Sequence, residues 1–591
     1  MLTGDNGILT RAGEAKERTS IAQEEEAANL SFTTVQMDLA QGKTVDTMAF
    51  QSIVDGNFGS GNATGTIGGN SYIITVKRTG INYQMDSNGN ISTLSELPID
   101  FEPGVLEKNG NTYIINSIED LVALSYSVNN GTNLYENCVV QLGRNLNFEE
   151  DGSYADASAK YSKDSYGYTP DSSSETTIKE YMTNKSGSGF VPIGLGNYFK
   201  GEFAGNNNSL TNLYINSKNP AGLFFGNAGS VALKIENLSI ISCDITSTSL
   251  AGALVGYGAN LEISGCTANG NITSSSSLAG GFVGLCSSVS IEYSSFSGNV
   301  SGNVSGGLVG QSYGTASLFD CSNKSGTVTV IGNSSGGGLV GQASNISIYN
   351  CYNKANVEKT GTNNSSSYIG GVVGSGGGII SDCYNKGNIT SENTSIPVGG
   401  IIGYGNNGID IVNCFNSGLI SSLGLAGGIV GFGPKSILNC YNFGSVTSTT
   451  SSSTNCLAGG ISALGGSIEI RFCYNSGNVT VSSTSGTVGG ITGTNATIKN
   501  CNNTGVITGG EYTTGYIVGN GSVDASNYYL KNSSSITKAN GATEKTESEM
   551  NEIMDIQSFC DLMNDYGRET YGTNIGLWGI GSDGLPDFGL E

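Results

Sequence analysis

The chain has 591 residues, 90 of them glycine, and a formal net charge of −23 at pH 7. With only 26 lysines and arginines, it lacks the basic surface that nucleic-acid binding requires. Histidine is absent, which excludes a Ser-His-Asp triad, a histidine-ligated metal and a zinc-protease motif built on two histidines. No run of 18 apolar residues occurs, so this sequence predicts no membrane-spanning helix.

The first predicted element is a helix over residues 8–41, which has a loose apolar stripe and an i,i+4 pair between Glu14 and Arg18. Further on, Ser71–Val76 and Ile81–Ile91 alternate apolar and polar residues and predict a β-hairpin. Because helices are stabilised mainly by burying one face, we expect the helix to pack on the hairpin with its start in solvent. Residues 1–100 are therefore predicted to form a helix-plus-sheet domain.

The segment Leu2–Ala12, LTGDNGILTRA, resembles type IV pilin-like proteins of Gram-positive bacteria. In that family a very apolar helix precedes such a segment and a charged amphipathic helix follows it, as residues 12–30 do here. The resemblance implies an upstream apolar segment of about 20 residues, through which alone the protein would meet a membrane. It also implies that the N-terminal helix could mediate homo-assembly.

Residues 101–220 are predicted to be the entry to a repeat array. They contain a strand at Tyr113–Ile115, a short helix at Ile118–Val128 and a strand at Val139–Leu142. A polar, tyrosine-rich insertion, Phe148–Gly189, interrupts this region. Long loops are functional or disordered, so the insertion is either decoration or a loop that contacts a glycan or protein.

Eleven copies of one five-residue motif lie between Gly222 and Gly519: two small residues, two bulky apolar residues and another small one. Gly280–Gly284 and Gly399–Gly403 are examples, and successive copies are 26 to 33 residues apart. A second motif, Ile-x-x-Cys followed two residues later by Asn, keeps step with the first. Two motifs locked to one period predict a repeat architecture, which builds long surfaces.

Each period supplies about three short strands, the first of them formed by the Gly-Gly motif. Ile and Cys are three residues apart and cannot share one face of a flat strand, so a corner must lie between them. The fold class is therefore mainly β: a right-handed parallel β-helix of about eleven coils over residues 221–520. The Asn column suits a turn, and its amides can also stack in ladders.

The cysteines follow the repeat. Stacked coils place equivalent side chains about 4.8 Å apart and pointing the same way, whereas a disulfide needs Cβ atoms about 3.8 Å apart and facing each other. We therefore predict buried free thiols, and neither a metal site nor any other cofactor. Nine of the 13 cysteines share one repeat position: Cys243, Cys266, Cys321, Cys351, Cys383, Cys414, Cys440, Cys473 and Cys501.

Residues 521–591 are predicted to cap the open end of the array, which would otherwise expose a strand edge and the core. Met550–Asn564 has the apolar pattern of a helix within this cap.

The Gly-x-apolar-apolar-Gly copies, the Cys-Tyr-Asn copies and the lead-in Phe203–Asn207 resemble the GLUG motif family, which occurs in large bacterial surface proteins and some secreted proteases. The resemblance covers roughly residues 105–590. It implies an extracellular or cell-surface location, while the motif itself implies no chemistry.

The candidate contact residues directly follow the cysteine column, and exposure decides their role. Buried rings would form a ladder that stabilises the sheet, whereas exposed rings could bind a glycan or a partner protein. These rings are Tyr352, Tyr384, Phe415, Tyr441 and Tyr474.

No catalytic or cofactor-binding residue is predicted. Asp320 and Asp382 share the position before Cys, but they are two coils and on the order of 10 Å apart, so both are expected to be solvated. The leading hypothesis is a non-enzymatic surface or secreted adhesin whose partner is a host or bacterial surface protein or glycan. The alternatives are a subunit or tip of a type IV pilus-like filament, and a β-helix carbohydrate-active enzyme.

Overall fold

The computed structural model describes residues 26–41, 43–59, 62–68, 71–76, 82–85, 91–94, 106–129, 131–148, 188–227, 231–360, 367–393, 396–406, 408–449, 456–510, 513–523, 525–531, 536, 539–553, 560–561, 564, 578–580 and 586–588. Residues 8–25 of the predicted helix and most of the insertion lie outside this set. The chain forms two compact units, Met1–Gly104 with Glu149–Ala159 and Val105–Phe148 with Lys160–Glu591. The finer four-part division stays a prediction.

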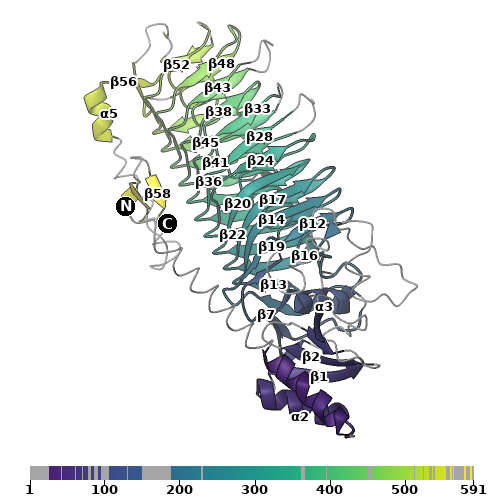
Figure 1. Ribbon diagram of the computed structural model, residues 1–591. Helices are drawn as coiled ribbons and strands as arrows, with labels where there is room; N and C mark the ends of the chain where they lie inside the picture. Colours follow the sequence, from purple (N-terminus) through teal and green to yellow (C-terminus); the bar gives the residue numbers. More distant parts are fainter. Residues whose placement is uncertain are drawn as a thin grey trace. The chain divides into compact units, whose positions relative to one another are not determined.

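The first unit combines two helices with a small antiparallel sheet (Figure 1). Residues 26–40 are helical, and a second helix, α2 (Thr47–Phe58), begins where the Asp46 carboxylate accepts a hydrogen bond of 2.8 Å from the backbone N–H of Ala49. The sheet runs in the order β1 (Ala63–Gly68), β2 (Ser71–Val76), β3 (Asn82–Met85) and β4 (Ile91–Leu94).

The core of this unit joins both helices to the sheet. Phe32 and Phe50 are fully buried with ring centroids 6.3 Å apart, and Phe50 meets Tyr72 of β2 edge-on at 5.1 Å. The predicted packing of the first helix on the hairpin is therefore confirmed over residues 26–40. Helix α2 was not predicted, because it has only two fully buried residues, Phe50 and Val54, and its apolar period is weak.

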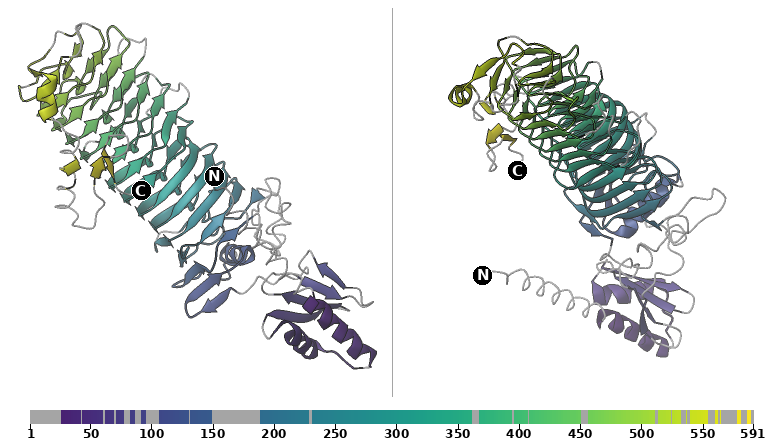
Figure 2. Two further views of the ribbon diagram at one scale, coloured as in Figure 1. Left: turned by 60° about the vertical axis from the view of Figure 1, so that its left-hand side comes forward. Right: turned by 90° about the horizontal axis from the view of Figure 1, so that it is seen from above.

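The second unit is a parallel β-solenoid of about thirteen turns (Figures 1 and 2). One turn consists of β18 (Leu278–Gly280), β19 (Val283–Glu292) and β20 (Ser295–Gly302). Each strand pairs in parallel with its equivalent in the next turn, giving three sheets along the solenoid. The predicted mainly β solenoid is confirmed, and its right-handedness stays a prediction.

The turns beyond the predicted eleven include those at the start of the solenoid, which lack the Gly-Gly motif. Strands β6 (Thr112–Ile115), β7 (Val139–Leu142), β10 (Glu202–Ala204) and β13 (Leu233–Glu236) pair in parallel in that order. Helix α3 (Ile118–Asn129) lies between β6 and β7 in the chain, as predicted.

The Gly-Gly motif forms a corner, and its prediction as a strand was wrong. Strand β39 (Leu425–Gly427) ends on the first glycine, and β40 (Val430–Phe432) begins three residues later in another sheet. Ten strands of two or three residues form the sheet before this corner: β15 (Ala251–Gly252), β18, β21 (Val304–Gly306), β25 (Gly336–Gly337), β29 (Ile369–Gly370), β34 (Pro397–Gly399), β39, β44 (Leu457–Gly459), β48 (Thr487–Gly489) and β53 (Thr514–Gly515).

The predicted corner between Ile and Cys is confirmed. The residue just before each column cysteine has left-handed backbone, for example Asp382 (φ 56°), Asn413 (φ 53°) and Asn439 (φ 52°). Asn and Asp tolerate this conformation better than most residues, which accounts for their frequency at this position.

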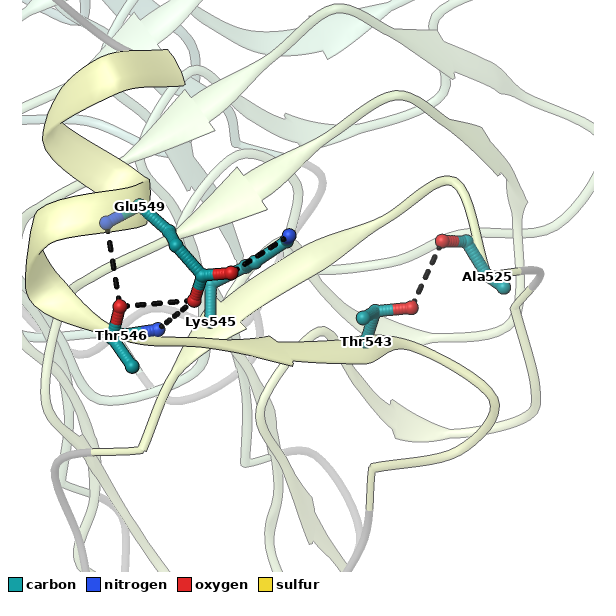
Figure 3. A network of polar contacts seen from close by, with 5 residues as sticks. All are labelled: Ala525, Thr543, Lys545, Thr546 and Glu549. Carbon is teal, nitrogen blue, oxygen red and sulfur yellow. Dashed lines mark hydrogen bonds and ion pairs between the residues drawn. The ribbon is translucent and has the colours of Figure 1, made fainter.

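The C-terminal part extends the solenoid and then forms a short helix. Strand β56 (Thr543–Lys545) pairs with β55 (Tyr528–Leu530), and α5 (Glu547–Ile553) follows. Thr546 and Glu549 form a capping box: the Thr546 N–H donates to the Glu549 carboxylate (2.8 Å), and the Glu549 N–H donates to the Thr546 hydroxyl (3.4 Å; Figure 3). The helix therefore begins three residues before the predicted Met550. Strands β57 (Trp578–Ile580) and β58 (Pro586–Phe588) pair antiparallel.

Candidate functional site

The predicted contact rings form a stack along one sheet of the solenoid. Strand β32 (Tyr384–Asn385) lies between β27 (Tyr352–Asn353) and β37 (Phe415–Asn416). The Tyr352 and Tyr384 ring centroids are 4.9 Å apart with planes 3° apart, and the Tyr384 and Phe415 centroids are also 4.9 Å apart.

Most of these rings are covered. Tyr384 is 1% exposed, Phe415 is 0% exposed and Tyr441 is 7% exposed, and Cys560 of the C-terminal part packs in the same cluster. Tyr474 is half-buried, and its hydroxyl lies 2.7 Å from that of Thr504. This burial favours the stabilising ladder. Binding by these rings stays a prediction, and it would require the residues that cover them to move.

A second ladder lies inside the solenoid, where the Asn column is fully buried. From Asn353 to Asn475, each amide donates to the side-chain oxygen of the next Asn, as from Asn385 to Asn416 and from Asn416 to Asn442, at 2.8 and 2.9 Å. From Asn353 to Asn503, each also donates to the carbonyl two residues on, as from Asn416 to Gly418 at 2.9 Å. The amide-ladder interpretation of this column is confirmed, and the left-handed turn belongs instead to the residue before Cys.

The nine column cysteines are buried free thiols, and the eight from Cys266 to Cys501 donate hydrogen bonds to backbone carbonyls. Cys383 and Cys351 each donate to the carbonyl two residues earlier, at 3.0 Å. Ser294, which fills this position in one repeat, makes the same bond to Glu292 at 2.7 Å. Burial raises the pKa of Cys243 and of Cys266 to about 12, so both thiols stay protonated at neutral pH.

We expect a thiol-reactive maleimide to label one of the 13 cysteines, Cys138, rapidly in the native protein. Cys138 is half-buried while the other twelve are buried, and thiolate character and access govern the reaction. Mass spectrometry after a short pulse measures this, and Cys138→Ser should remove the fast label. Rapid labelling of several column cysteines would contradict the buried ladder.

The predicted solvation of the two aspartates was wrong for Asp382. It is 2% exposed, it accepts hydrogen bonds from the Ser381 hydroxyl (2.5 Å) and the Asn413 amide (3.0 Å), and burial raises its pKa. Asp320 is half-buried, and burial raises its pKa to about 6. The sequence did not predict that either side chain would be covered. Both residues lie at a left-handed corner, where the alternation of buried and exposed residues along a strand does not apply.

Asp320→Asn is expected to stabilise the fold at pH 7 by about 1 kcal/mol, after allowance for solvent screening. Because the folded-state pKa of Asp320 is raised, the folded state binds the extra proton, and wild-type stability falls as pH rises from about 4 to about 6. Asn already occupies the equivalent corner at Asn350 and Asn413. Thermal unfolding at pH 4 and pH 7 tests this: the two proteins should converge at pH 4, and an equal gap at both would contradict it.

A groove on another side of the solenoid was not predicted. It has a volume of about 480 Å³ and is lined by Phe432, Gly433, Pro434, Lys435, Leu464 and Ile468 together with four small residues, and we call it the Phe432 groove. Tyr368, Tyr404 and Phe432 stack beside it, with centroids 4.4 and 5.6 Å apart. The available signal was an aromatic residue directly after the last glycine of two adjacent motif copies, at Tyr404 and Phe432, as also at Tyr257.

Among the residues that the structure describes, no group of three or more Cys, Asp or Glu side chains is placed to hold a metal ion. The helices in this part of the chain include none that is long and apolar enough to cross a membrane.

The comparison with protein families agrees with the repeat architecture. Residues 332–358 match the GLUG motif. No curated protein matches the chain. A solved structure named a "putative immunoglobulin A1 protease" from Bacteroides ovatus is similar, with 16% identity and a TM-score of 0.29, over 81% of this chain and 92% of that one. A second, named IgA1 protease, has 17% identity and a TM-score of 0.34, over 65% of this chain and 25% of that one.

The names of these structures correct one expectation. Both are names of proteases, so the prediction that this chain is not an enzyme is withdrawn. The likeness is at low identity and low TM-score, and it assigns no activity to this chain.

Proposed function

We propose that this chain is an extracellular or cell-surface adhesin, in which the β-solenoid presents a long surface to a partner protein or glycan. The observation that carries the proposal is the unbroken parallel stack of about thirteen turns, since solenoids of this kind use their extended faces for binding. The GLUG motif at residues 332–358 supports it, because the motif family occurs in bacterial surface proteins.

Attachment of the purified chain to cell surfaces tests the proposal. Cys138, as the half-buried thiol, is the natural position for a fluorescent maleimide that leaves the solenoid intact. We expect saturable attachment to bacterial or epithelial cells, and competition by unlabelled chain. Attachment that never saturates, or that unlabelled chain cannot displace, would contradict an adhesin.

A filament subunit is the second candidate, and exposed apolar residues on the first helix favour it. Leu30 is 53% exposed and Met37 is 60% exposed, and seven residues place them on one face of the helix. The opposite face supplies Phe32 and Val35 to the core of the unit. A second copy of the chain would bury the Leu30–Met37 face.

Light scattering of the full chain at increasing concentration tests this assembly. If the face joins copies, a Leu30→Asp/Met37→Asp double variant should remain monomeric where the wild type associates. A double variant at Asn29 and Gln36, which are exposed, also seven residues apart and about a quarter-turn away round the same helix, is the matched control and should associate as the wild type does. A monomeric wild type at all concentrations would reject the filament hypothesis for this chain.

A further inference from the structure

We propose that the Phe432 groove, with the stacked rings of Tyr368, Tyr404 and Phe432, is a binding site for a neutral oligosaccharide chain. This inference rests on the proposed contact function and names its site and ligand class. It concerns a different face from the covered rings of Tyr352 and Tyr384.

The first argument is the set of rings. Tyr368, Tyr404 and Phe432 are each half-buried, so each keeps an accessible part while its packing holds it in place. Tyr404 and Phe432 are paired positions in adjacent strands, β35 (Ile402–Gly405) and β40, so the rings follow the long axis of the solenoid. Stacking turns the ring faces toward one another and holds the row rigid, and Phe432 is the ring of this row on the groove lining, where the apolar C–H face of a sugar can pack.

The second argument is the groove beside the row. Its volume of about 480 Å³ lies within the range of small-molecule sites. Phe432 and Leu464 on its lining are half-buried. Gly466 and Gly408 edge it, and a Cβ at either position would meet nothing within 4 Å. These glycines leave space for a ligand, and the exposed Ser467 adds a hydroxyl for hydrogen bonding to sugar hydroxyls.

The third argument is charge. The Lys435 ammonium lies 3.1 Å from the Asp410 carboxylate, so the cation on the groove lining is paired. Arg471 likewise pairs with Glu469 nearby in the same sheet, where Glu469 stands next to Ser436 and Ser436 next to Asp410. A site whose charges are paired, on a chain of net charge −23, fits a neutral ligand better than a polyanion.

Isothermal titration of the full chain with maltohexaose, cellohexaose, xylohexaose and mannohexaose tests the proposal, with hexagalacturonate as the acidic counterpart. We expect at least one neutral hexasaccharide to bind one-to-one and hexagalacturonate not to bind. Tyr404→Ala should weaken binding about tenfold, since it removes one ring of the stack. Tyr313→Ala is the matched control, because that tyrosine is 61% exposed and is not part of the stack.

Two further variants keep the test decisive if Tyr404→Ala perturbs folding. Phe432→Trp keeps a ring on the groove lining and adds a fluorophore, so a bound neutral sugar should shift its emission relative to the wild type. Asp410→Asn removes the partner of Lys435 and should allow hexagalacturonate to bind.

The outcomes separate the inference from the function on which it rests. No heat and no emission shift with any neutral hexasaccharide at about 10 mM, far above useful affinities, would overturn the groove as a sugar site. Equal affinity in the wild type and in Tyr404→Ala would also overturn it. If the chain still attaches to cells in either case, the adhesin proposal stands without this site, whereas sugar binding without attachment would reject the adhesin alone.

Discussion

Gly428→Ala is expected to separate adjacent turns of the solenoid and to cost about 3 kcal/mol or more, at the upper end of overpacking effects. A Cβ on Gly428 would overlap the Gly460 carbonyl oxygen of the next turn and the side-chain amide of Asn442. Both neighbours are held by the stack itself, so neither can move aside alone. The urea midpoint followed by circular dichroism should fall, and amide exchange should accelerate around residues 425–461.

Gly377→Ala is the matched control within the same solenoid. Its added Cβ would meet the Asn406 Cβ and the Ser344 carbonyl oxygen at 3.6 Å, which is ordinary contact. We expect a change within about 0.5 kcal/mol, because such positions lack a destabilising mechanism. A wild-type midpoint for Gly428→Ala would mean that the turns can separate freely, and that the Gly-Gly corner is not set by close approach.

The same contact explains why the two sequence motifs keep step. In seven of the corners the second glycine lies against the Asn amide of the same turn, as Gly428 against Asn442 and Gly400 against Asn416. One motif therefore supplies the space that the other fills. The sequence period predicted the solenoid correctly, because both motifs recur once per turn. It could not show that the glycines form a corner, because the room available for a side chain at these positions is set by the neighbouring turns.

The candidate sites were harder to predict for the same reason. The covering of Phe415 involves Cys560, which is 145 positions along the chain (560 minus 415), and no local pattern carries that contact. Tyr404, Phe432 and Leu464 each follow the last residue of a motif copy in successive turns, but only the first two are aromatic, and no motif shows that Phe432 and Leu464 line one groove. Local periodicity indicates which residues face inward, whereas a site depends on which turns lie side by side.

Asn416→Ala is expected to cost about 3 kcal/mol, because it leaves several buried polar groups without partners. Asn416 is fully buried, donates to the Gly418 carbonyl and to the Asn442 side-chain oxygen, both at 2.9 Å, and accepts from the Asn385 amide at 2.8 Å. Asn388→Ala is the control: Asn388 is exposed and accepts one bond, from the Leu419 N–H at 3.0 Å. It should lower the urea midpoint far less.

Asn416→Asp separates lost hydrogen bonds from lost volume, since Asp has the size of Asn but its ionised carboxylate donates nothing. At pH 7 the carboxylate would face the Gly418 carbonyl and the Asn442 oxygen, so we expect a larger loss than in Asn416→Ala. Burial would raise the folded-state pKa of this carboxyl, so stability should recover as pH falls and the protonated group regains one donor. If Asn416→Asp matched the wild type at pH 7, the amide bonds would not be what holds the turns together. Equal losses in the two variants at every pH would contradict the expected contribution of the buried carboxylate charge.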